Sequence, residues 1–315
     1  MELLRGTTRR PRPWRRPDVW ITGVADDLDP GNQPTVVVCH GAEWLLDPSL
    51  ADLAPNWWFD SFARATEVAV RSAARTIVPS EYTRGAIVQA WGIASDRVVA
   101  IKYGVDPARF RPGANARSPR VSRAIGDRPY VLFVGVPNRA KNPLLLKEAV
   151  KQLIDDGYPH ALVIVGPRPG SNWDLPEYAD EVDAEIPGAP DRFLRIGEIG
   201  DDELVPLMSG ADVFCLPSIK ESFGIPVLEA MACGTPVVVA NRAALPEVVG
   251  DAGIVCEPTV DAVAASLSRV LSDHSLAAEL AARGRRRAEE TTWRHAADGY
   301  LTVLERTARD ASSPR

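Results

Sequence analysis

Hydrophobic positions in the second half of the chain follow two alternating patterns. Short continuous apolar runs recur between longer segments in which apolar residues return every three or four positions. The first pattern is typical of strands buried in a parallel sheet, and the second of amphipathic helices. We expect strands at 129–135, 160–166, 192–197, 211–217, 236–240 and 253–256. We expect helices starting at 201 and spanning 143–156, 224–233, 245–250, 261–271, 274–290 and 293–308. This alternation predicts an α/β fold, with a parallel sheet that is covered by helices on both faces.

The first half of the chain is less regular but shows the same alternation. Strands are predicted at 35–40, 75–79 and 98–102, and helices at 59–72 and 81–90. Ser80 precedes the second helix and is predicted to be its N-cap. Residues 111–127 are rich in proline, glycine, serine and arginine, which is typical of an interdomain linker. We therefore expect domains at 35–112 and 129–292, a linker at 113–128, and a final helix with a polar tail at 293–315.

Composition narrows the class of protein. The chain has 315 residues, of which 45% are hydrophobic, enough for two domains with sizeable cores. A net charge of −6 and a pI near 5.4 argue against nucleic acid as the main partner. No apolar run reaches the roughly 18 residues of a membrane span, and the N-terminus lacks the apolar core of a signal peptide. A cytoplasmic location is expected.

The cysteines agree with that location. None of the four forms a Cys-x-x-Cys pair, and the sequence places Cys39, Cys215, Cys233 and Cys256 mostly in apolar segments. This pattern indicates small buried thiols in a reducing compartment and not a disulfide framework or a zinc site.

Residues 1–34 are predicted to form an irregular basic arm. Six arginines fall within its first sixteen positions: Arg5, Arg9, Arg10, Arg12, Arg15 and Arg16. Two interpretations stay open for this arm. It is either an unfolded or misassigned start of the reading frame, or a segment that contacts anionic lipid at a membrane surface.

Residues 221–236 carry the most chemical information. They read Glu-Ser-Phe-Gly-Ile-Pro-Val-Leu-Glu-Ala-Met-Ala-Cys-Gly-Thr-Pro, so that Glu221 and Glu229 stand eight positions apart. A predicted strand precedes this stretch, and a glycine-containing turn leads from it into a helix. Such a turn directs free backbone N–H groups and the positive end of the helix dipole at one place, which suits a phosphate. Glu229, inside the helix, is expected to accept hydrogen bonds from a ribose, and Glu221 to lie near the phosphates.

This stretch resembles the nucleotide-sugar site of the retaining glycosyltransferases of family 4, whose Glu-x7-Glu motif falls on Glu221 and Glu229. Other stretches match the family in the same order, so that the resemblance covers about residues 35–308: 76–81, 102–106, 132–135, 141–142, 165–167 and 245–247. The resemblance implies the GT-B fold, which has two Rossmann-like domains with parallel sheets and an active site between them. It also implies that the final helix crosses back to the first domain. It also implies a metal-independent reaction without a cofactor, in which a nucleoside-diphosphate sugar is the co-substrate and a carbohydrate, a lipid or a small molecule is the acceptor.

The resemblance also implies roles for single residues. Lys141 is expected to stabilise the charge that develops on the leaving phosphate, and Glu221 to orient the sugar or the lysine. His40 ends a predicted strand and is expected near the sugar and the acceptor, so these three are the catalytic candidates. The candidate donor-binding residues are Arg139, Ser222, Phe223, Gly224, Ile225, Glu229, Gly197 and Ile199, with Phe223, Gly224 and Ile225 offering backbone N–H groups to phosphate and Gly197 and Ile199 lying near the nucleobase.

The sequence departs from the family in two places. The family carries more chain before the strand at 35–40. We therefore expect either that the true start of the chain lies further upstream, or that the N-terminal domain is shortened and lacks its first strand. Where the family often has an arginine, this chain has Val136, and Arg139 is the candidate replacement. Two alternatives to a hexosyltransferase therefore stay open: a homologue that binds the nucleotide sugar without transferring it, and a GT-B-type nucleotide-sugar epimerase.

Overall fold

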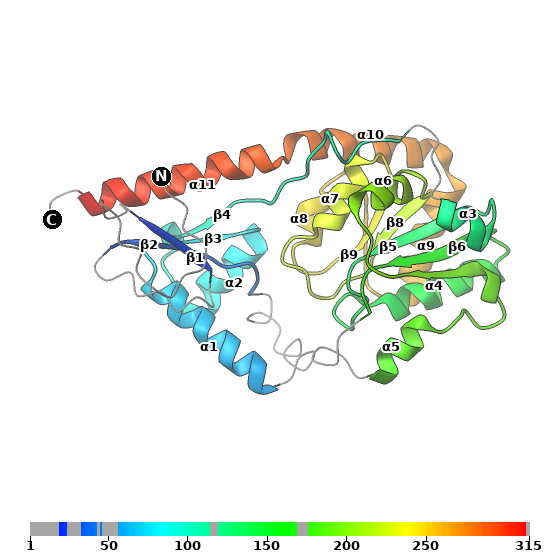
Figure 1. Cartoon of the computed structure of the whole chain (residues 1–315), viewed down its shortest axis with the longest axis horizontal. Coiled ribbons are helices and arrows are strands. Elements are labelled where there is room, and N and C mark those ends of the chain that lie inside the picture. The colour runs from blue at the N-terminus through cyan, green and yellow to red at the C-terminus, as the bar shows by residue number, and fades with distance from the viewer. Residues whose placement is uncertain are drawn as a thin grey trace. The chain divides into compact units, whose positions relative to one another are not determined.

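The chain forms two compact units, each built around its own parallel sheet (Figure 1). The computed structural model describes residues 19–23, 33–42, 45, 56–113, 119–168 and 176–312. The smaller unit comprises Met1–Lys102 and Arg294–Arg315, and the larger unit comprises Tyr103–Trp293. The predicted α/β class, with parallel sheets, is confirmed. Within the described residues, no helix is both long and apolar enough to cross a membrane.

The smaller unit has four parallel strands in the order β1-β2-β3-β4. The strands are β1 (Trp20–Gly23), β2 (Thr35–Val38), β3 (Arg75–Val78) and β4 (Val98–Ala100). The helices of this unit are α1 (Asn56–Ser72), α2 (Glu81–Trp91) and α11 (Trp293–Ser312), with a short 3-10 turn at Ser95–Arg97. Val36 and Ile77 of the sheet pack against Val303 and Leu304 of α11. The end of the chain therefore folds onto the sheet formed by its beginning (Figure 1).

In this unit the predicted N-cap of α2 is confirmed, whereas strand β1 was not predicted. The Oγ of Ser80 accepts a hydrogen bond from the backbone N–H of Thr83, as expected of an N-cap. The expectation that no strand precedes Thr35 is wrong, because β1 pairs in parallel with β2, with Trp20 opposite Thr35. All four residues of β1 are only half-buried, so it lacks the continuous apolar run that marks the other strands. The basic residues at positions 5–16 lie outside the described residues.

The larger unit has six parallel strands in the order β10-β9-β8-β5-β6-β7. The strands are β5 (Tyr130–Val134), β6 (Ala161–Val165), β7 (Phe193–Ile196), β8 (Val213–Leu216), β9 (Val237–Ala240) and β10 (Ile254–Cys256). The helices are α3 (Pro119–Ile125), α4 (Pro143–Asp155), α5 (Pro176–Asp183), α6 (Asp201–Ser209), α7 (Ile225–Ala232), α8 (Leu245–Val249), α9 (Val260–Ser272) and α10 (His274–Glu290), with a 3-10 turn at Pro190–Arg192.

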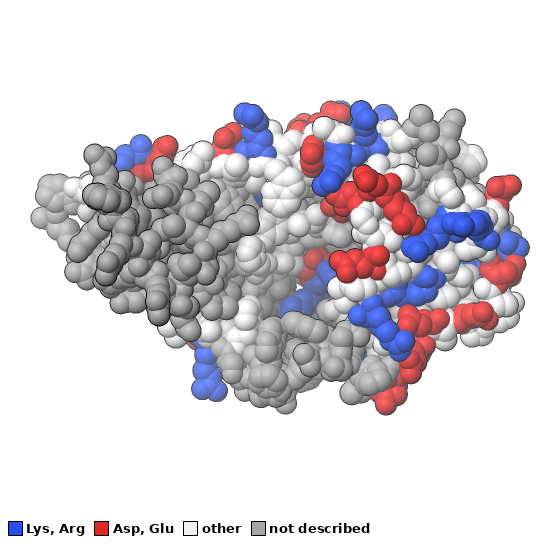
Figure 2. All heavy atoms as spheres, in the orientation of Figure 1, with Lys and Arg blue, Asp and Glu red and all other residues white. Residues whose placement is uncertain are grey.

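Helices cover both faces of this sheet, which explains why its strands are continuously apolar. α6, α7 and α8 lie on one side of it and α4 on the other (Figure 1), as right-handed crossovers require. Every residue of β6, β8 and β9 is buried. On the face seen in Figure 2, acidic and basic side chains are mixed over the described part of this unit.

The division between the units differs from the expected domain boundaries. Val105 and Phe110, expected in the first domain, belong to the core of the larger unit, and Val105 forms a bridge with Thr292. Part of the expected linker is helix α3, whose Val121 and Ile125 are buried in the same core. Helix α5 lies in a stretch for which the sequence pattern predicted no element.

All four cysteines are free thiols. Cys39, Cys215 and Cys233 are buried and Cys256 is half-buried. Burial raises the pKa of the Cys215 thiol well above its usual value, so that this thiol is unreactive at neutral pH. The prediction of small buried thiols is confirmed.

Candidate functional site

The order of the strands in the larger unit creates a single place where neighbouring loops leave in opposite directions. The chain runs from β5 to β6 and β7 on one side, then returns to place β8 on the other side of β5. Parallel sheets bind ligands outside the carboxyl ends of the strands at such a reversal. The loop after β5 (residues 135–142) and the loop after β8 (residues 217–224) meet there, since the N–H of Ile219 donates to the carbonyl of Ala140 over 2.9 Å.

Lys141 and Glu221 form an ion pair across these two loops. The pair is largely buried, with 23% of the lysine side chain and 10% of the glutamate side chain exposed. The lysine is held by a turn, because its backbone N–H donates to both the backbone carbonyl and the side-chain oxygen of Asn138, each over 3.0 Å. The backbone carbonyl of Glu221 in turn accepts from the N–H of Ala244 over 3.2 Å. A cation and a carboxylate, separated by 80 positions in the sequence, are thus brought together at the strand reversal.

The turn after Glu221 leads into helix α7 through Gly224. This glycine has φ of +104°, and a Cβ atom on it would lie 3.0 Å from Cδ2 of Leu245, so a residue with a side chain would be strained here. Phe223 is buried and its ring meets the ring of Tyr103 edge-on, with 5.4 Å between centroids. Among the described residues, no acceptor receives the N–H groups of Phe223, Gly224 or Ile225. Free N–H groups at the start of a helix, together with the helix dipole, are an arrangement that suits an anion; the phosphate that the sequence predicts here stays a prediction.

Glu229 lies within α7 and is half-buried. Burial raises the pKa of its carboxyl to about 7, with a further contribution from Asp201. The carboxyl has no hydrogen bond or ion pair with a side chain that the structure describes, whereas Asp201 is paired with Arg109 over 2.6 Å. Glu229 therefore carries unsatisfied acceptor capacity at the helix that follows the turn, as a residue that binds hydroxyl groups requires.

The other candidate residues are placed differently. Ser222 and Ile225 flank the turn. Gly197 and Ile199 follow β7, and Ile199 packs partly against the core. Arg139 is exposed, and its guanidinium carbon lies 5.6 Å from the ring centroid of Tyr178 on α5.

His40 belongs to the smaller unit. It is exposed and follows the carboxyl end of β2, where the N–H of Cys39 donates to the carbonyl of Ile77 over 2.9 Å. No cluster of three or more histidine, cysteine or carboxylate side chains suited to a metal occurs in the described part of the chain.

Two further residues belong to this region but were not selected from the sequence. Ser218 lies two residues after β8 and is fully buried, and its Oγ finds no partner among the described residues. Its position just after a buried strand was the available signal. Arg195 lies on β7 and hydrogen bonds to backbone carbonyls of the loop after β6. A single arginine within a predicted strand carries no sequence signal for a place in the site.

Two family models match the chain. The model described as "Glycosyl transferases group 1" matches residues 115–287, and that described as "Glycosyltransferase Family 4" matches residues 15–109. The first contains nearly all of the larger unit, including every residue of the site except His40, and the second covers most of the smaller unit.

Curated relatives are similar over most of this chain. The O-antigen chain mannosyltransferase B of Escherichia coli is 32% identical over 230 residues, which are 70% of this chain and 58% of that protein. The D-inositol 3-phosphate glycosyltransferase of Salinispora arenicola is 34% identical over 283 residues, which are 85% of this chain and 63% of that protein. The chain thus spans less than two thirds of the length of these relatives.

Solved structures share the architecture. Sucrose-phosphate synthase from Thermosynechococcus elongatus is 26% identical with a TM-score of 0.73, and the match covers 90% of this chain and 69% of that one. Anabaena HepE, in complex with UDP and glucose, is 21% identical with a TM-score of 0.74, covering 87% and 72% of the two chains, and shows likeness of fold alone. With its two parallel sheets, its Glu221–Glu229 motif and these matches, the chain belongs to the glycosyltransferases of family 4 and has their GT-B fold.

Proposed function

We propose that the protein is a retaining hexosyltransferase, which moves a mannose- or glucose-type sugar from a nucleoside-diphosphate sugar to an acceptor hydroxyl. The observation that carries this proposal is the buried Lys141–Glu221 pair beside the unsatisfied N–H groups of the turn at Gly224. A diphosphate leaving group needs positive charge and hydrogen-bond donors fixed where negative charge develops. In this proposal Lys141 supplies the charge and the N–H groups of the turn supply the donors, so that the transfer is metal-independent.

In this proposal the nucleotide sugar binds to the free backbone N–H groups of the turn and to Lys141. The diphosphate accepts from the N–H groups of Phe223, Gly224 and Ile225 and replaces Glu221 as the partner of Lys141. Glu221, released from the lysine, accepts hydrogen bonds from hydroxyl groups of the transferred sugar. Arg139 contributes further positive charge, and Ser222 lines the turn.

Glu229 binds the ribose in the same proposal. A carboxylate can accept from both ribose hydroxyls only in its ionised form. Since the pKa of the Glu229 carboxyl is about 7 without a nucleotide, this carboxyl is protonated in close to half of the molecules at neutral pH. Nucleotide binding then releases that proton and lowers the pKa of Glu229, while the backbone near Gly197 and Ile199 meets the nucleobase.

For the donor and the acceptor, the relatives indicate where to begin. The complex of Anabaena HepE with UDP-glucose makes UDP-sugars the first donors to test, followed by GDP-sugars because one relative is named a mannosyltransferase. The acceptor is a hydroxyl of a carbohydrate, a lipid or a small molecule, and His40 is proposed to act on the sugar and the acceptor. Four free thiols fit a cytoplasmic enzyme, and the basic residues near the N-terminus are proposed to contact anionic membrane lipid.

The test combines binding with turnover. UDP-, GDP- and ADP-sugars are titrated against the purified protein by thermal shift, and release of free sugar is followed by chromatography. Lys141→Met is compared with Lys151→Met, a control in which a partly exposed lysine paired with Asp155 is lost from α4. We expect one nucleotide sugar to stabilise the parent and to be hydrolysed slowly, and Lys141→Met alone to lose hydrolysis.

Each alternative function has its own signature in this experiment. Binding of a nucleotide sugar without release of sugar, in the presence of a panel of acceptors, identifies a binding homologue. Conversion of the donor into an epimer identifies an epimerase. Absence of binding to every donor contradicts the proposal as a whole.

A further inference from the structure

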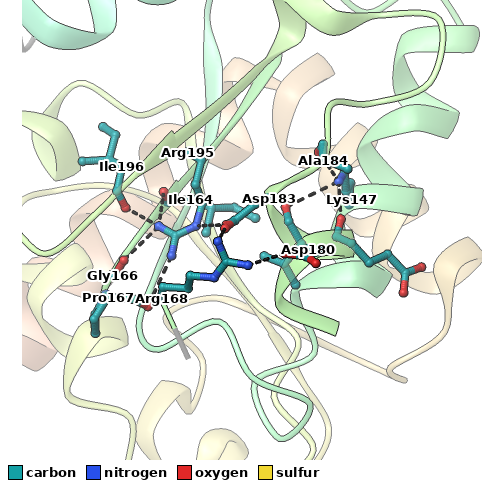
Figure 3. A network of polar contacts seen from close by, with 12 residues as sticks. Lys147, Ile164, Gly166, Pro167, Arg168, Asp180, Asp183, Ala184, Arg195 and Ile196 are labelled. Carbon is teal, nitrogen blue, oxygen red and sulfur yellow. Dashed lines mark hydrogen bonds and ion pairs between the residues drawn. The ribbon is translucent and has the colours of Figure 1, made fainter. Parts of the chain in front are cut away.

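Arg195 lies on β7, two residues before Gly197, and most of its side chain is buried, with 14% exposed. β7 is one of the two edge strands of the six-stranded sheet. Figure 3 shows the guanidinium surrounded by the carbonyls of Gly166, Pro167 and Ile196 and by the carboxylate of Asp183. A buried arginine on an edge strand therefore joins three separate parts of the larger unit.

The contacts of Arg195 connect the carboxyl ends of two strands with a helix. Its Nη1 donates to the carbonyl of Gly166 over 2.8 Å and also to that of Ile196. Its Nη2 donates to the carbonyl of Pro167 over 3.2 Å. Its Nε donates to Asp183 at the end of α5 over 3.0 Å. One planar cation thus holds the loop after β6 against the end of β7.

The segments that Arg195 joins have little freedom to shift independently. The N–H of Gly166 donates to the carbonyls of Ile196 and Gly197 over 3.1 and 3.3 Å. A Cβ on Gly166, which has φ of +144°, would lie only 2.1 Å from the carbonyl oxygen of Gly135. Gly135 begins the loop that carries Lys141. A displacement at the end of β7 is therefore expected to shift the ends of β6, its neighbour, and of β5, the next strand in the sheet.

Neighbouring charged residues hold Asp183, whose carboxylate accepts from Arg195. Arg168, which is 58% exposed, pairs with Asp183 over 3.4 Å and with Asp180. Lys147 donates to the carbonyls of Glu181, over 2.8 Å, and of Ala184, which satisfies the end of α5 (Figure 3). Asp183 is thereby held in place from both sides.

We infer that Arg195 is a positioning residue for the nucleobase: it sets the backbone at Gly166, Pro167 and Gly197 against which the base of the donor lies. This inference rests on the proposed function. A lysine at this position keeps the charge but has no fork of parallel N–H donors. It leaves carbonyls of the two loops without a donor, and such loss at a buried site is costly.

The test separates recognition of the base from recognition of the diphosphate. Affinities for UDP, GDP, ADP and inorganic pyrophosphate are measured by calorimetry for the parent and for Arg195→Lys. We expect affinity for the preferred nucleotide to fall about tenfold, discrimination among the three bases to narrow, and pyrophosphate affinity to stay unchanged. Arg84→Lys is the matched control, since Arg84 donates to the carbonyls of Val98 and Ser95 in the smaller unit over 2.8 and 3.0 Å; it should change none of these affinities.

A merely structural role moves all affinities together. Equal losses for nucleotide and pyrophosphate, or no loss for either, overturn the inference. If Arg195→Lys does not fold, Asp183→Asn replaces it, with an expected loss of about threefold in the nucleotide-to-pyrophosphate ratio, and an unchanged ratio overturns the inference. If the parent binds none of the three nucleotides, the proposed function fails and the inference falls with it. If the parent binds a nucleotide and the variant has the same nucleotide-to-pyrophosphate affinity ratio, only the inference is refuted.

Discussion

Replacing Glu229 by glutamine is expected to stabilise the larger unit, by an amount that grows with pH. The carboxyl has a pKa of about 7 in the folded protein against an ordinary value of 4.5, chiefly because burial disfavours its charged form. Between these two values the folded state holds a proton that the unfolded state has released. The free energy of unfolding therefore falls as the pH rises through this window. Glutamine has no proton to lose and escapes this cost.

The size of the gain follows from the two pKa values. A gap of about 2.5 between them corresponds to roughly 3 kcal/mol when the folded carboxyl is fully ionised. This figure is an upper limit, because the side chain is only half-buried and water screens part of the cost. At pH 5 the same relation gives a destabilisation of only about 1 kcal/mol. The stabilisation by Glu229→Gln should therefore be about 2 kcal/mol larger at pH 8.5 than at pH 5.

The assay must report on the larger unit alone. Hydrogen exchange in increasing urea, measured by mass spectrometry at the buried strands β8 and β9, gives the unfolding free energy of this unit for the parent and the variant. The measurement is made at pH 5 and pH 8.5, with no ligand present. The same samples at intermediate pH values locate the midpoint of the change.

Glu257→Gln is the control, with the opposite sign. Glu257 is exposed, and hydrogen bonds from Asn241 and Arg242, over 2.9 and 2.8 Å, lower the pKa of its carboxyl. That interaction stabilises the fold above the unfolded pKa and is lost as the pH falls, so its removal should lower stability slightly at pH 8.5 and leave it unchanged in acid. A gain for Glu229→Gln that is equal at both pH values would refute the reasoning, since it would then come from packing and not from ionisation.

Three further predictions concern the site and its supports. Lys141→Met should lower donor hydrolysis by about 10²–10³-fold in kcat, because it removes charge from the leaving group; an unchanged kcat would contradict its role. Gly224→Ala should destabilise the larger unit by about 1–3 kcal/mol through strain at φ +104° and contact with Leu245, as measured by urea denaturation, whereas a neutral effect would show that the turn yields easily. Ser80→Ala should cost the smaller unit about 1–2 kcal/mol by removing the N-cap of α2, and circular dichroism on heating will show whether it does.

The sequence predicted an element accurately where its residues form a continuous buried run, and poorly where few of them are buried. Strands such as β6 and β9 are continuously apolar because helices cover both faces of the sheet, and they were predicted to within a residue or so at each end. β1 has four half-buried residues and was missed. α3 was taken for linker because prolines and arginines surround its two buried residues, Val121 and Ile125.

The sequence alone determined the parallel α/β class, the turn at Gly224 and the helix that carries Glu229, because these depend on periodicity and on neighbours within a few positions. The close pairing of Lys141 with Glu221 was decided by the tertiary structure, since these residues are 80 positions apart and meet through the return of the chain to place β8 beside β5. The raised pKa of Glu229 and the contacts of Arg195 were also decided there. Burial and hydrogen bonds to distant carbonyls depend on which surfaces the folded chain brings together, and no local pattern in the sequence records that.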